Sequence, residues 1–583
     1  MRIKNLQQKR ALHIALLVLL LNVVGMTNVL AQSFTVGDLN YSFNEGGITV
    51  TLTGHFYGTN ASGTLDIPSE VTYNGHTYTV TAIGDNAFKD CTGLIGLLSI
   101  PNTVTTIGDY AFYNTRFTGN LTLSNALVSI GSYAFYCTYN NNYSGSLILP
   151  ETLITIGDYA FYSPQNTYQN SNFSGNLTIP NSVTTIGAYA FNNCCSGNGT
   201  LTIGEGVQTI GKHAFSYCGF QTVNFNAIAC TLMEHDGSSV FRSCSSLTTL
   251  HIGENVQIIP SYAFMYCSSF TGPLNIPNSV TTIESRAFAD CSGFTGSLVI
   301  PDLVTTIGDG AFINCSGFTS LTLGNSVTSI DSYAFAGCSG FTGNLIIPNS
   351  VTIIGGGDNS LGGDGAFSDC SGFTGDLAIP NTVIEVRGHA FQRCSGFNSL
   401  TIGTSVNKIG WAAFSGCSGL TEVNYNATNC SQIGGSFDLF LGITHPAFGT
   451  GSTQASLNIG DNVQTIPNYA FFGCSCFSGT LTIPNSVTTI GFRSFEGCSG
   501  FTSLVIGSSV TYVNGRAFYG FTLWTTTSRS RCLAVRGACT STLGDGMFSP
   551  TSRKTAPTCS RCRPQPTRQR VAVSSSGRKE RRC

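Results

Sequence analysis

The stretch GSLVIPDLVTTIGDGAFINCSGF, residues 296–318, is one unit of a repeat that runs through most of the chain. Its most constant part is Ala-Phe, with Cys-Ser-Gly beginning three residues after the Phe. Phenylalanine returns at this place 18 times between Phe88 and Phe518, mostly at steps of 23 or 24 residues. An internal period of about 20–50 residues is typical of solenoids and arrays. The chain is therefore expected to be a stack of small turns.

Each unit should contain two extended pieces and one tight turn. Leu298 and Ile300 alternate with one outward residue between them, which is typical of a short strand. Pro301 should end this strand, because proline lacks the N–H group that a sheet needs. Ile307 belongs to a second extended piece, and Ala311–Phe312 to a single helical or 3-10 turn. We therefore predict a mainly β repeat solenoid, an arc with one short strand and one short helical or 3-10 turn per unit of 23–24 residues.

The inward side chains of one turn can be buried only by the neighbouring turns. Cysteine recurs among them and has three possible explanations: a buried thiol, a disulfide ladder or a metal ligand. The parallel side chains of a stack are poorly aimed for disulfide bonds, and no Cys-x-x-Cys motif has a matching second pair. Buried thiols are therefore preferred. The predicted structural core includes Phe88, Phe112, Phe288, Phe312, Phe335, Phe391, Phe414, Phe471, Phe495, Cys291, Cys315 and Cys338.

Charge is scarce and unevenly distributed. Charged residues make up only 10% of the chain. Between Gln32 and Gly520 there are 10 Lys and Arg against 27 Asp and Glu, a balance of −17. Between Phe521 and Cys583 there are 13 against 2, a balance of +11. The repeat body should therefore repel nucleic acid, and only the tail could attract it.

The N-terminal residues do not follow the repeat. Residues 1–31 are predicted to be a secretory signal peptide, with a basic start, an apolar stretch and small residues before Gln32. The apolar stretch is too short for a membrane anchor, so no membrane span is expected in the mature chain. Residues 32–80 are predicted to be a β-rich cap. One hairpin should have strands over 34–43 and 48–52, and a second should turn at Asn74–Gly75.

The solenoid is expected to cover residues 81–520, and residues 521–583 depart from it. After Phe518 the expected Cys-Ser-Gly is missing, and a basic, irregular sequence follows. A reading-frame shift would produce such a change, and a genuine basic tail for acidic polymers is the alternative. Only Thr542–Phe548 still looks like a closing unit.

Two columns of outward residues are candidate binding surfaces. One column lies directly before Ala-Phe and includes Tyr110, Tyr133, Tyr159 and Tyr189. Its aromatic rings could bind sugar rings by stacking, or they could form a half-buried ladder. The other is the outward residue of the first strand, which is small, hydroxylated or aliphatic and suits a protein or glycan better than a phosphate. Its candidate binding residues are Thr122, Thr178, Thr202, Asn275, Thr322, Thr401, Asn458 and Thr482.

Motifs for catalysis, metals and cofactors are lacking in the sequence. It contains no Gly-x-Ser-x-Gly elbow, His-Glu-x-x-His or phosphate loop. Met233–Ser239 gathers acid, base and nucleophile types, but a triad needs tertiary geometry and a polar loop is the simpler interpretation. Gly355–Gly365 is similar to a single calcium-binding turn, and a flexible insertion is the alternative. We therefore expect no enzyme activity, no metal and no cofactor.

Pieces such as LTIPNSVTTIGAYAFNNC and LNIPNSVTTIESRAFADC resemble the bacterial leucine-rich-repeat subclass found in BspA-like surface proteins. The resemblance covers roughly residues 60–520 and includes two longer units that begin at Val223 and Val423. It implies a secreted or cell-surface solenoid that binds host proteins, matrix or other microbes, and it supplies no catalytic residue. The expected function is therefore a non-enzymatic adhesin with an extracellular protein or glycan ligand. A glycan-binding or periplasmic scaffold module is the alternative.

Overall fold

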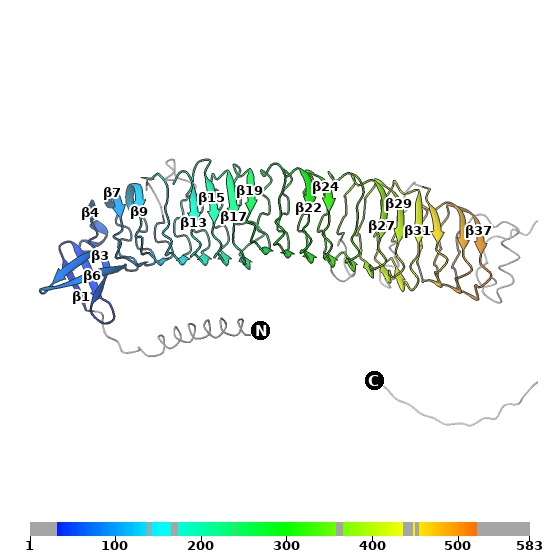
Figure 1. Ribbon diagram of the computed structural model, residues 1–583, viewed down its shortest axis with the longest axis horizontal. Coiled ribbons are helices and arrows are strands. Elements are labelled where there is room, and N and C mark those ends of the chain that lie inside the picture. The colour runs from blue at the N-terminus through cyan, green and yellow to red at the C-terminus, as the bar shows by residue number, and fades with distance from the viewer. Residues whose placement is uncertain are drawn as a thin grey trace, which may run out of the picture. The chain divides into compact units, whose positions relative to one another are not determined.

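The computed structural model describes residues 32–136, 142–164, 173–237, 239–356, 365–434, 447–448 and 454–521. Within them, successive units lie side by side and pair through parallel backbone hydrogen bonds. Figure 1 shows two rows of strands along the stack, one of longer arrows and one of very short arrows. The predicted mainly β repeat solenoid is confirmed. The predicted signal peptide and nearly all of the basic tail lie outside the described residues.

The row of longer strands, called here the long-strand face, comes from the first extended piece of each unit. Its inward residues are apolar, and its outward residues alternate with them. The strands are β4 (Ser62–Gly63), β7 (Gly93–Ser99), β9 (Arg116–Thr122), β11 (Asn142–Tyr143), β13 (Leu177–Ile179), β15 (Thr200–Ile203), β17 (Thr222–Phe225), β19 (Thr249–Ile252), β22 (Gly296–Val299), β24 (Phe318–Thr322), β27 (Gly375–Ile379), β29 (Phe397–Ile402), β31 (Glu422–Tyr425), β33 (Ser456–Ile459), β35 (Gly479–Ile483) and β37 (Phe501–Ile506).

The second row, called here the short-strand face, consists of two-residue strands, in nearly all of which an exposed or half-buried residue precedes a buried one. They are β8 (Thr106–Ile107), β10 (Ser129–Ile130), β12 (Thr155–Ile156), β14 (Thr185–Ile186), β16 (Thr209–Ile210), β18 (Leu232–Met233), β20 (Ile258–Ile259), β21 (Thr282–Ile283), β23 (Thr306–Ile307), β25 (Ser329–Ile330), β26 (Ile353–Ile354), β28 (Glu385–Val386), β30 (Lys408–Ile409), β32 (Gln432–Ile433), β34 (Thr465–Ile466), β36 (Thr489–Ile490) and β38 (Tyr512–Val513).

The N-terminal strands differ because most of them pair antiparallel. β1 (Ser33–Val36) pairs with β2 (Leu39–Phe43), β2 with β3 (Thr49–His55), and β5 (Glu70–Tyr73) with β6 (His76–Ile83). Asn74 and Gly75 form the β5–β6 turn with positive φ, as this residue pair predicts. The segment 34–43, predicted as one strand, is divided by a turn at Gly37, which has a φ of 60°. β6 pairs in parallel with β3 and β8, which joins these strands to the solenoid.

The Ala-Phe segment is not the helical turn that we predicted. Three alternate N–H groups, those of Gly310, Phe312 and Asn314, donate to carbonyl oxygens of the next unit at 2.7–2.8 Å. The N–H groups between them bond three residues back within their own unit. This alternation requires left-handed backbone at Gly310 and Asn314, with φ of 58° and 59°. In a helix all of these N–H groups would bond within their own unit. Here every second one bonds to the next unit instead, so no helix forms. The described residues contain one helix, the 3-10 turn η1 (Gly58–Asn60).

The repeated phenylalanines form a continuous stack inside the solenoid. From Phe88 to Phe518, each ring stacks on the next with centroids 5.2–5.9 Å apart. The structure buries every phenylalanine that we named as core, and none of them exceeds 3% exposure. Burial of each such ring contributes about 1.5–3 kcal/mol, and only the adjoining units make that burial possible.

The cysteine column lies beside the phenylalanine stack. Cys291, Cys315 and Cys338 are fully buried, and all cysteines in the described part of the chain are free thiols. Each of these three thiols donates to the carbonyl oxygen of the marker Phe one unit earlier, at 3.0 Å. The same bond recurs for seven further thiols: Cys218, Cys244, Cys370, Cys394, Cys417, Cys474 and Cys498. Cysteine thus supplies a small apolar side chain that also donates to a buried carbonyl.

Candidate functional site

All eight outward residues predicted to bind a ligand are exposed or half-buried, and seven of them lie on strands of the long-strand face. Asn275 lies in no strand, between β20 and β21 in the sequence. They do not form one uninterrupted column of paired strands. Thr178 and Thr202 are direct neighbours in the β13–β15 pair. Thr401, Asn458 and Thr482 lie in the six-stranded sheet from β27 to β37. The remaining three, Thr122, Asn275 and Thr322, lie elsewhere along the stack.

The six-stranded sheet offers the longest uninterrupted run of outward residues. In it, Thr401 pairs with Asn424, Asn424 with Asn458, and Asn458 with Thr482. The amide nitrogen of Asn458 donates to Asn424 Oδ1 at 2.9 Å and also to Glu422 Oε1 at 2.5 Å. Asn424 was not predicted from the sequence because this residue belongs to one of the longer units. Its equivalent in the first longer unit, Asn224, was missed for the same reason and donates to Thr202 at 3.2 Å.

A second outward column runs beside the first, two residues earlier on each strand. Ser399 donates to Asp376 Oδ1 at 2.7 Å and lies opposite Glu422 in the neighbouring strand. Thr480 and Ser503 share a hydrogen bond of 2.5 Å. The long-strand face therefore carries hydroxyl and amide groups in two columns. The acidic side chains of Asp376 and Glu422 lie in the second column. Only the strand register, which the sequence does not specify, reveals this second column.

The tyrosine column forms a ladder whose rings cover one another. Tyr110, Tyr133, Tyr159 and Tyr189 stack in sequence with centroids 4.7 Å apart and ring planes within 10°. A parallel ladder one residue after the marker Phe holds Tyr113, Tyr136 and Tyr162, at 5.0 and 4.9 Å. We call these seven residues the tyrosine ladder. All seven are half-buried.

The ends of the column from Tyr110 to Tyr189 are also covered. The Lys89 ammonium lies 4.6 Å from the Tyr110 ring centroid, and the His213 ring lies 4.9 Å from that of Tyr189. Stacking on a sugar needs an open ring face, and in the column from Tyr110 to Tyr189 the faces are occupied by other rings or by Lys89. Partial burial raises the pKa of Tyr136 and Tyr159 to about 12, so the hydroxyl groups stay neutral at physiological pH. The column from Tyr110 to Tyr189 therefore presents ring edges and hydroxyl groups rather than open ring faces.

The short-strand face of the same region is hollowed into a groove of about 680 Å³. Its lining includes the hydroxyl residues Thr106, Ser129 and Thr155, and successive glycines. Asp85, Asp109 and Asp158 also line it, and each accepts a hydrogen bond from a backbone N–H of the next unit at 2.6–2.8 Å. These carboxylates therefore already act as caps that connect the units.

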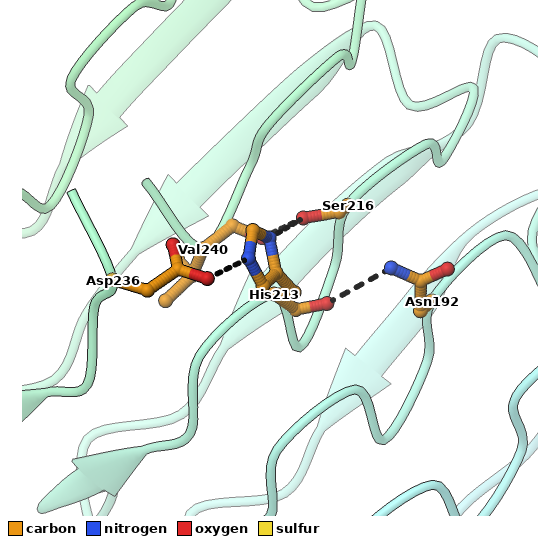
Figure 2. Close-up of polar contacts among 5 residues, drawn as sticks. All are labelled: Asn192, His213, Ser216, Asp236 and Val240. Carbon is orange, nitrogen blue, oxygen red and sulfur yellow. Dashed lines mark hydrogen bonds and ion pairs between the residues drawn. The ribbon is translucent and has the colours of Figure 1, made fainter. Parts of the chain in front are cut away.

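Acid, base and nucleophile types do meet at one place, which Figure 2 shows. Asp236 Oδ2 lies 3.0 Å from His213 Nε2, and Ser216 Oγ lies 3.1 Å from His213 Nδ1. Asp236 comes from the segment 233–239 that the sequence singled out, but its histidine partner lies one unit earlier. The Ser216 hydroxyl is fully buried and donates to the Val240 carbonyl at 3.3 Å. Because no substrate can reach that hydroxyl, the cluster is a hydrogen-bonded tie between two units.

Metal and membrane features are not apparent in the described part of the chain. There, no group of three or more His, Cys, Asp and Glu residues is arranged to hold a metal ion. Residues 357–364 of the glycine-rich segment considered for calcium lie outside the described residues. Among the described residues, no helix is long and apolar enough to cross a membrane.

Comparison with known families agrees with the repeat geometry. The family model named BspA type leucine rich repeat region (6 copies) matches residues 54–166, 163–295, 295–357, 362–440 and 442–554. The chain belongs to the BspA-type leucine-rich-repeat family. The resemblance found in the sequence is thus confirmed. BspA-type repeats form a fold that is typically a non-enzymatic binding scaffold, which indicates a binding or scaffold role.

The solved structures similar to this BspA-type chain include three from bacteria. A leucine-rich repeat protein from Bacteroides ovatus is 22% identical over 84% of this chain and 92% of its own, with a TM-score of 0.35. A leucine rich cell surface protein from Faecalibacterium prausnitzii is 22% identical over 68% and 95%, with a TM-score of 0.32. The pneumococcal vaccine antigen PcpA is 16% identical over 75% and 94%, also with a TM-score of 0.32. No curated protein matches the chain.

Proposed function

We propose that this chain is a secreted or cell-surface binding protein without enzyme activity, an adhesin that contacts an extracellular protein through its long-strand face. The observation that carries this proposal is the column of outward residues that stays in register from Ala378 on β27 to Val505 on β37. Family membership supports a binding role, and the leader-like residues 1–31 support export.

The chemistry of this face suits a protein partner. Its outward residues are mostly small and uncharged, so many of them can be desolvated at modest cost. Hydroxyl and amide groups such as those of Thr401 and Asn458 supply hydrogen bonds, and the exposed Val505 side chain supplies apolar contact. Protein interfaces combine such polar groups with apolar contact over a wide area. A repeated strand face provides that area without a deep pocket.

The glycan-binding alternative rests mainly on the tyrosine ladder. The ring faces of that ladder stack on one another at 4.7 Å, so they are not available to sugar rings. Its hydroxyl groups could still donate hydrogen bonds to a glycan, which keeps this alternative testable. A scaffold in the periplasm is distinguished from an adhesin by where the chain is found.

An array that carries both extracellular matrix proteins and polysaccharides tests the proposal. The purified full-length chain should bind one or more proteins, and binding should be lost when Thr401→Arg and Thr482→Arg are combined. These substitutions place two large cations on the long-strand face, where they interfere with any close partner. Affinity for the captured protein should fall at least tenfold.

A matched control places the same two cations on the other face of neighbouring units. Thr465→Arg and Thr489→Arg alter β34 and β36 on the short-strand face and should leave binding unchanged. Equal losses in both double variants would contradict the assignment of the face. Binding to polysaccharides alone, lost on Tyr136→Ala but not on Thr401→Arg with Thr482→Arg, would favour the glycan alternative. Labelling of intact cells with an impermeable reagent tests surface exposure.

A further inference from the structure

A polar groove lies between the unit that begins at Val423, called here the second longer unit, and the units on either side of it. Its volume is about 600 Å³, within the range of about 300–1,000 Å³ that is usual for small-molecule sites. The groove is found where the chain passes from the long-strand face at β29 to the short-strand face at β30. Its lining residues are Ile384, Thr404, Ser405, Asn407, Thr428, Asn429 and Asn462.

The groove opens where one hydrogen bond between units is missing. In the first longer unit, which begins at Val223, the Ile228 carbonyl accepts a hydrogen bond from the N–H of Gln257 in the next unit at 3.0 Å. Thr428 and Gln464 hold these two positions in the second longer unit. No hydrogen bond joins them, although both belong to the described part of the chain. The second longer unit is therefore less tightly joined to its neighbour at this place.

The bond to the preceding unit is the same in both longer units. The N–H groups of Thr428 and Ile228 each donate to a carbonyl oxygen of that unit, at 3.0 and 3.2 Å. The side chains differ, because Ile228 and Ala229 stand in the first longer unit where Thr428 and Asn429 stand in the second. The fold thus accepts either pair, and the polar pair is not needed to form the turn.

The amide groups around the groove have two different roles. Asn407 fixes the local shape, since its Nδ2 donates to the Asn429 carbonyl at 3.1 Å and its Oδ1 accepts from Ser431 Oγ at 2.8 Å. The side-chain amides of Asn429 and Asn462 make no hydrogen bond within the described part of the chain, and both residues are exposed. Each of these two amides offers two N–H donors and one acceptor oxygen to a ligand.

We propose that this groove binds a neutral carbohydrate through the amides of Asn429 and Asn462 and the side chain of Ile384. All seven lining residues are neutral, so the groove has no charge with which to match an anion or a cation. Sugar hydroxyl groups both donate and accept hydrogen bonds, as the two amides do. Ile384 is 49% exposed and supplies an apolar surface for the C–H groups of a sugar ring.

A protein partner suits this groove less well than a sugar does. Protein interfaces usually involve about 20–30 residues on each side, with an apolar and often aromatic centre. The groove has seven lining residues, of which only Ile384 is apolar. The adhesin surface proposed above instead extends over a whole sheet of the long-strand face. The two sites use different residues, so this proposal does not depend on that function.

An array of neutral oligosaccharides and their sialylated or sulfated counterparts, offered to the full-length chain, tests this site. Neutral members should bind, and added negative charge should not strengthen binding. Isothermal titration with the tightest neutral oligosaccharide then compares variants. Thr428→Ile combined with Asn429→Ala introduces the residues of the first longer unit and is therefore expected to fold. This double variant should lose affinity by about tenfold or more, because ligand hydroxyl groups lose their partners.

A matched pair of asparagines keeps the result specific. Asn255 in the unit after the first longer unit is equivalent to Asn462 and is also exposed. Asn462→Ala should lower the affinity, whereas Asn255→Ala should leave it unchanged. The proposal is overturned if no neutral oligosaccharide binds, if acidic ones bind more tightly, or if the two asparagine variants lose affinity equally. Wild-type affinity in Thr428→Ile with Asn429→Ala would also overturn it, as would a loss of protein binding alone in that variant.

Discussion

The position two residues before the marker Phe behaves differently in two regions of the molecule. At Tyr110 and Tyr133 it has φ of 56° and 59°, and the tyrosine rings stack 4.7 Å apart. At Arg286 and Arg493 the backbone has nearly the same φ, 53° in both, but the side chains form ion pairs with acidic neighbours. One backbone conformation therefore carries two unlike surfaces. The inward residues maintain the fold, and the outward residues are free to specialise.

The largest effect should come from removing the shared interior. Phe135 lies in the unit of Tyr133 and Phe312 in an ordinary unit, and both are buried between two stacked rings. Phe135→Ala and Phe312→Ala should each lower the free energy of unfolding by about 3–5 kcal/mol, because each leaves a cavity. Chemical denaturation of both variants measures this.

The outward Thr322→Ala is the control and should stay within about 0.5 kcal/mol of the wild type. A markedly smaller loss at Phe135 than at Phe312 would mean that the tyrosine ladder supports its units independently of the interior.

A smaller effect is expected where units approach most closely. Gly157 lies four residues before its marker Phe, and a Cβ added there would lie 2.5 Å from the Ser132 nitrogen. Gly157→Ala should cost about 1–3 kcal/mol through this overlap. Asp331 holds the same position in its own unit and already has a Cβ, so Asp331→Ala should cost less than half as much. Thermal melting measures the loss of stability in the two variants. Equal decreases in melting temperature would show that the glycine is not needed for close stacking.

The tyrosine ladder should add less than the interior does. Tyr133 stacks on two rings, at 4.7 Å from each, and aromatic pairs contribute about 0.5–1.5 kcal/mol beyond area burial. Tyr133→Ala should therefore cost about 1–3 kcal/mol in denaturant titrations. Arg286→Ala, at the same position in another unit, removes a half-exposed ion pair and should stay within about 0.5 kcal/mol. If Tyr133→Phe, which retains the ring, proved as harmful as Tyr133→Ala, stacking would not be the source of the effect.

The smallest effect concerns alkaline pH. Burial raises the pKa of Tyr136 to about 12 from an ordinary value of 10. The folded state thus holds the phenol proton more tightly than the unfolded state does. This contribution is complete below pH 10 and is lost as the pH rises towards 12. Tyr136→Phe should therefore flatten the decline of stability between pH 10 and 12, measured by urea titration at each pH. An unchanged slope would show that the ladder hydroxyl groups titrate as in water.

Several particular features could be predicted from the sequence. The position of Phe312 followed from its period, and the β5–β6 turn followed from Asn74 and Gly75, because these signals are local or repeated. The helical turn at Ala311–Phe312 was predicted wrongly. Whether an N–H bonds within its own unit or to the next depends on the neighbouring unit. Asn424 was missed because it belongs to one of the longer units. The meeting of His213 with Asp236 was missed because it depends on register across units.

The amino-acid sequence by itself determined that this chain is a stack of repeats, since an inward residue returning every 23 or 24 positions can be buried only by its neighbours. Tertiary structure alone decided what each surface offers. It closes the tyrosine faces because the spacing between units, 4.7 Å from ring to ring, leaves no room between the rings. It also brings the thiols of Cys194 and Cys195 together while holding other thiols against carbonyl groups. The ring spacing and the bonds of thiols to carbonyl groups join residues of different units, and these distances exist only once the units have stacked.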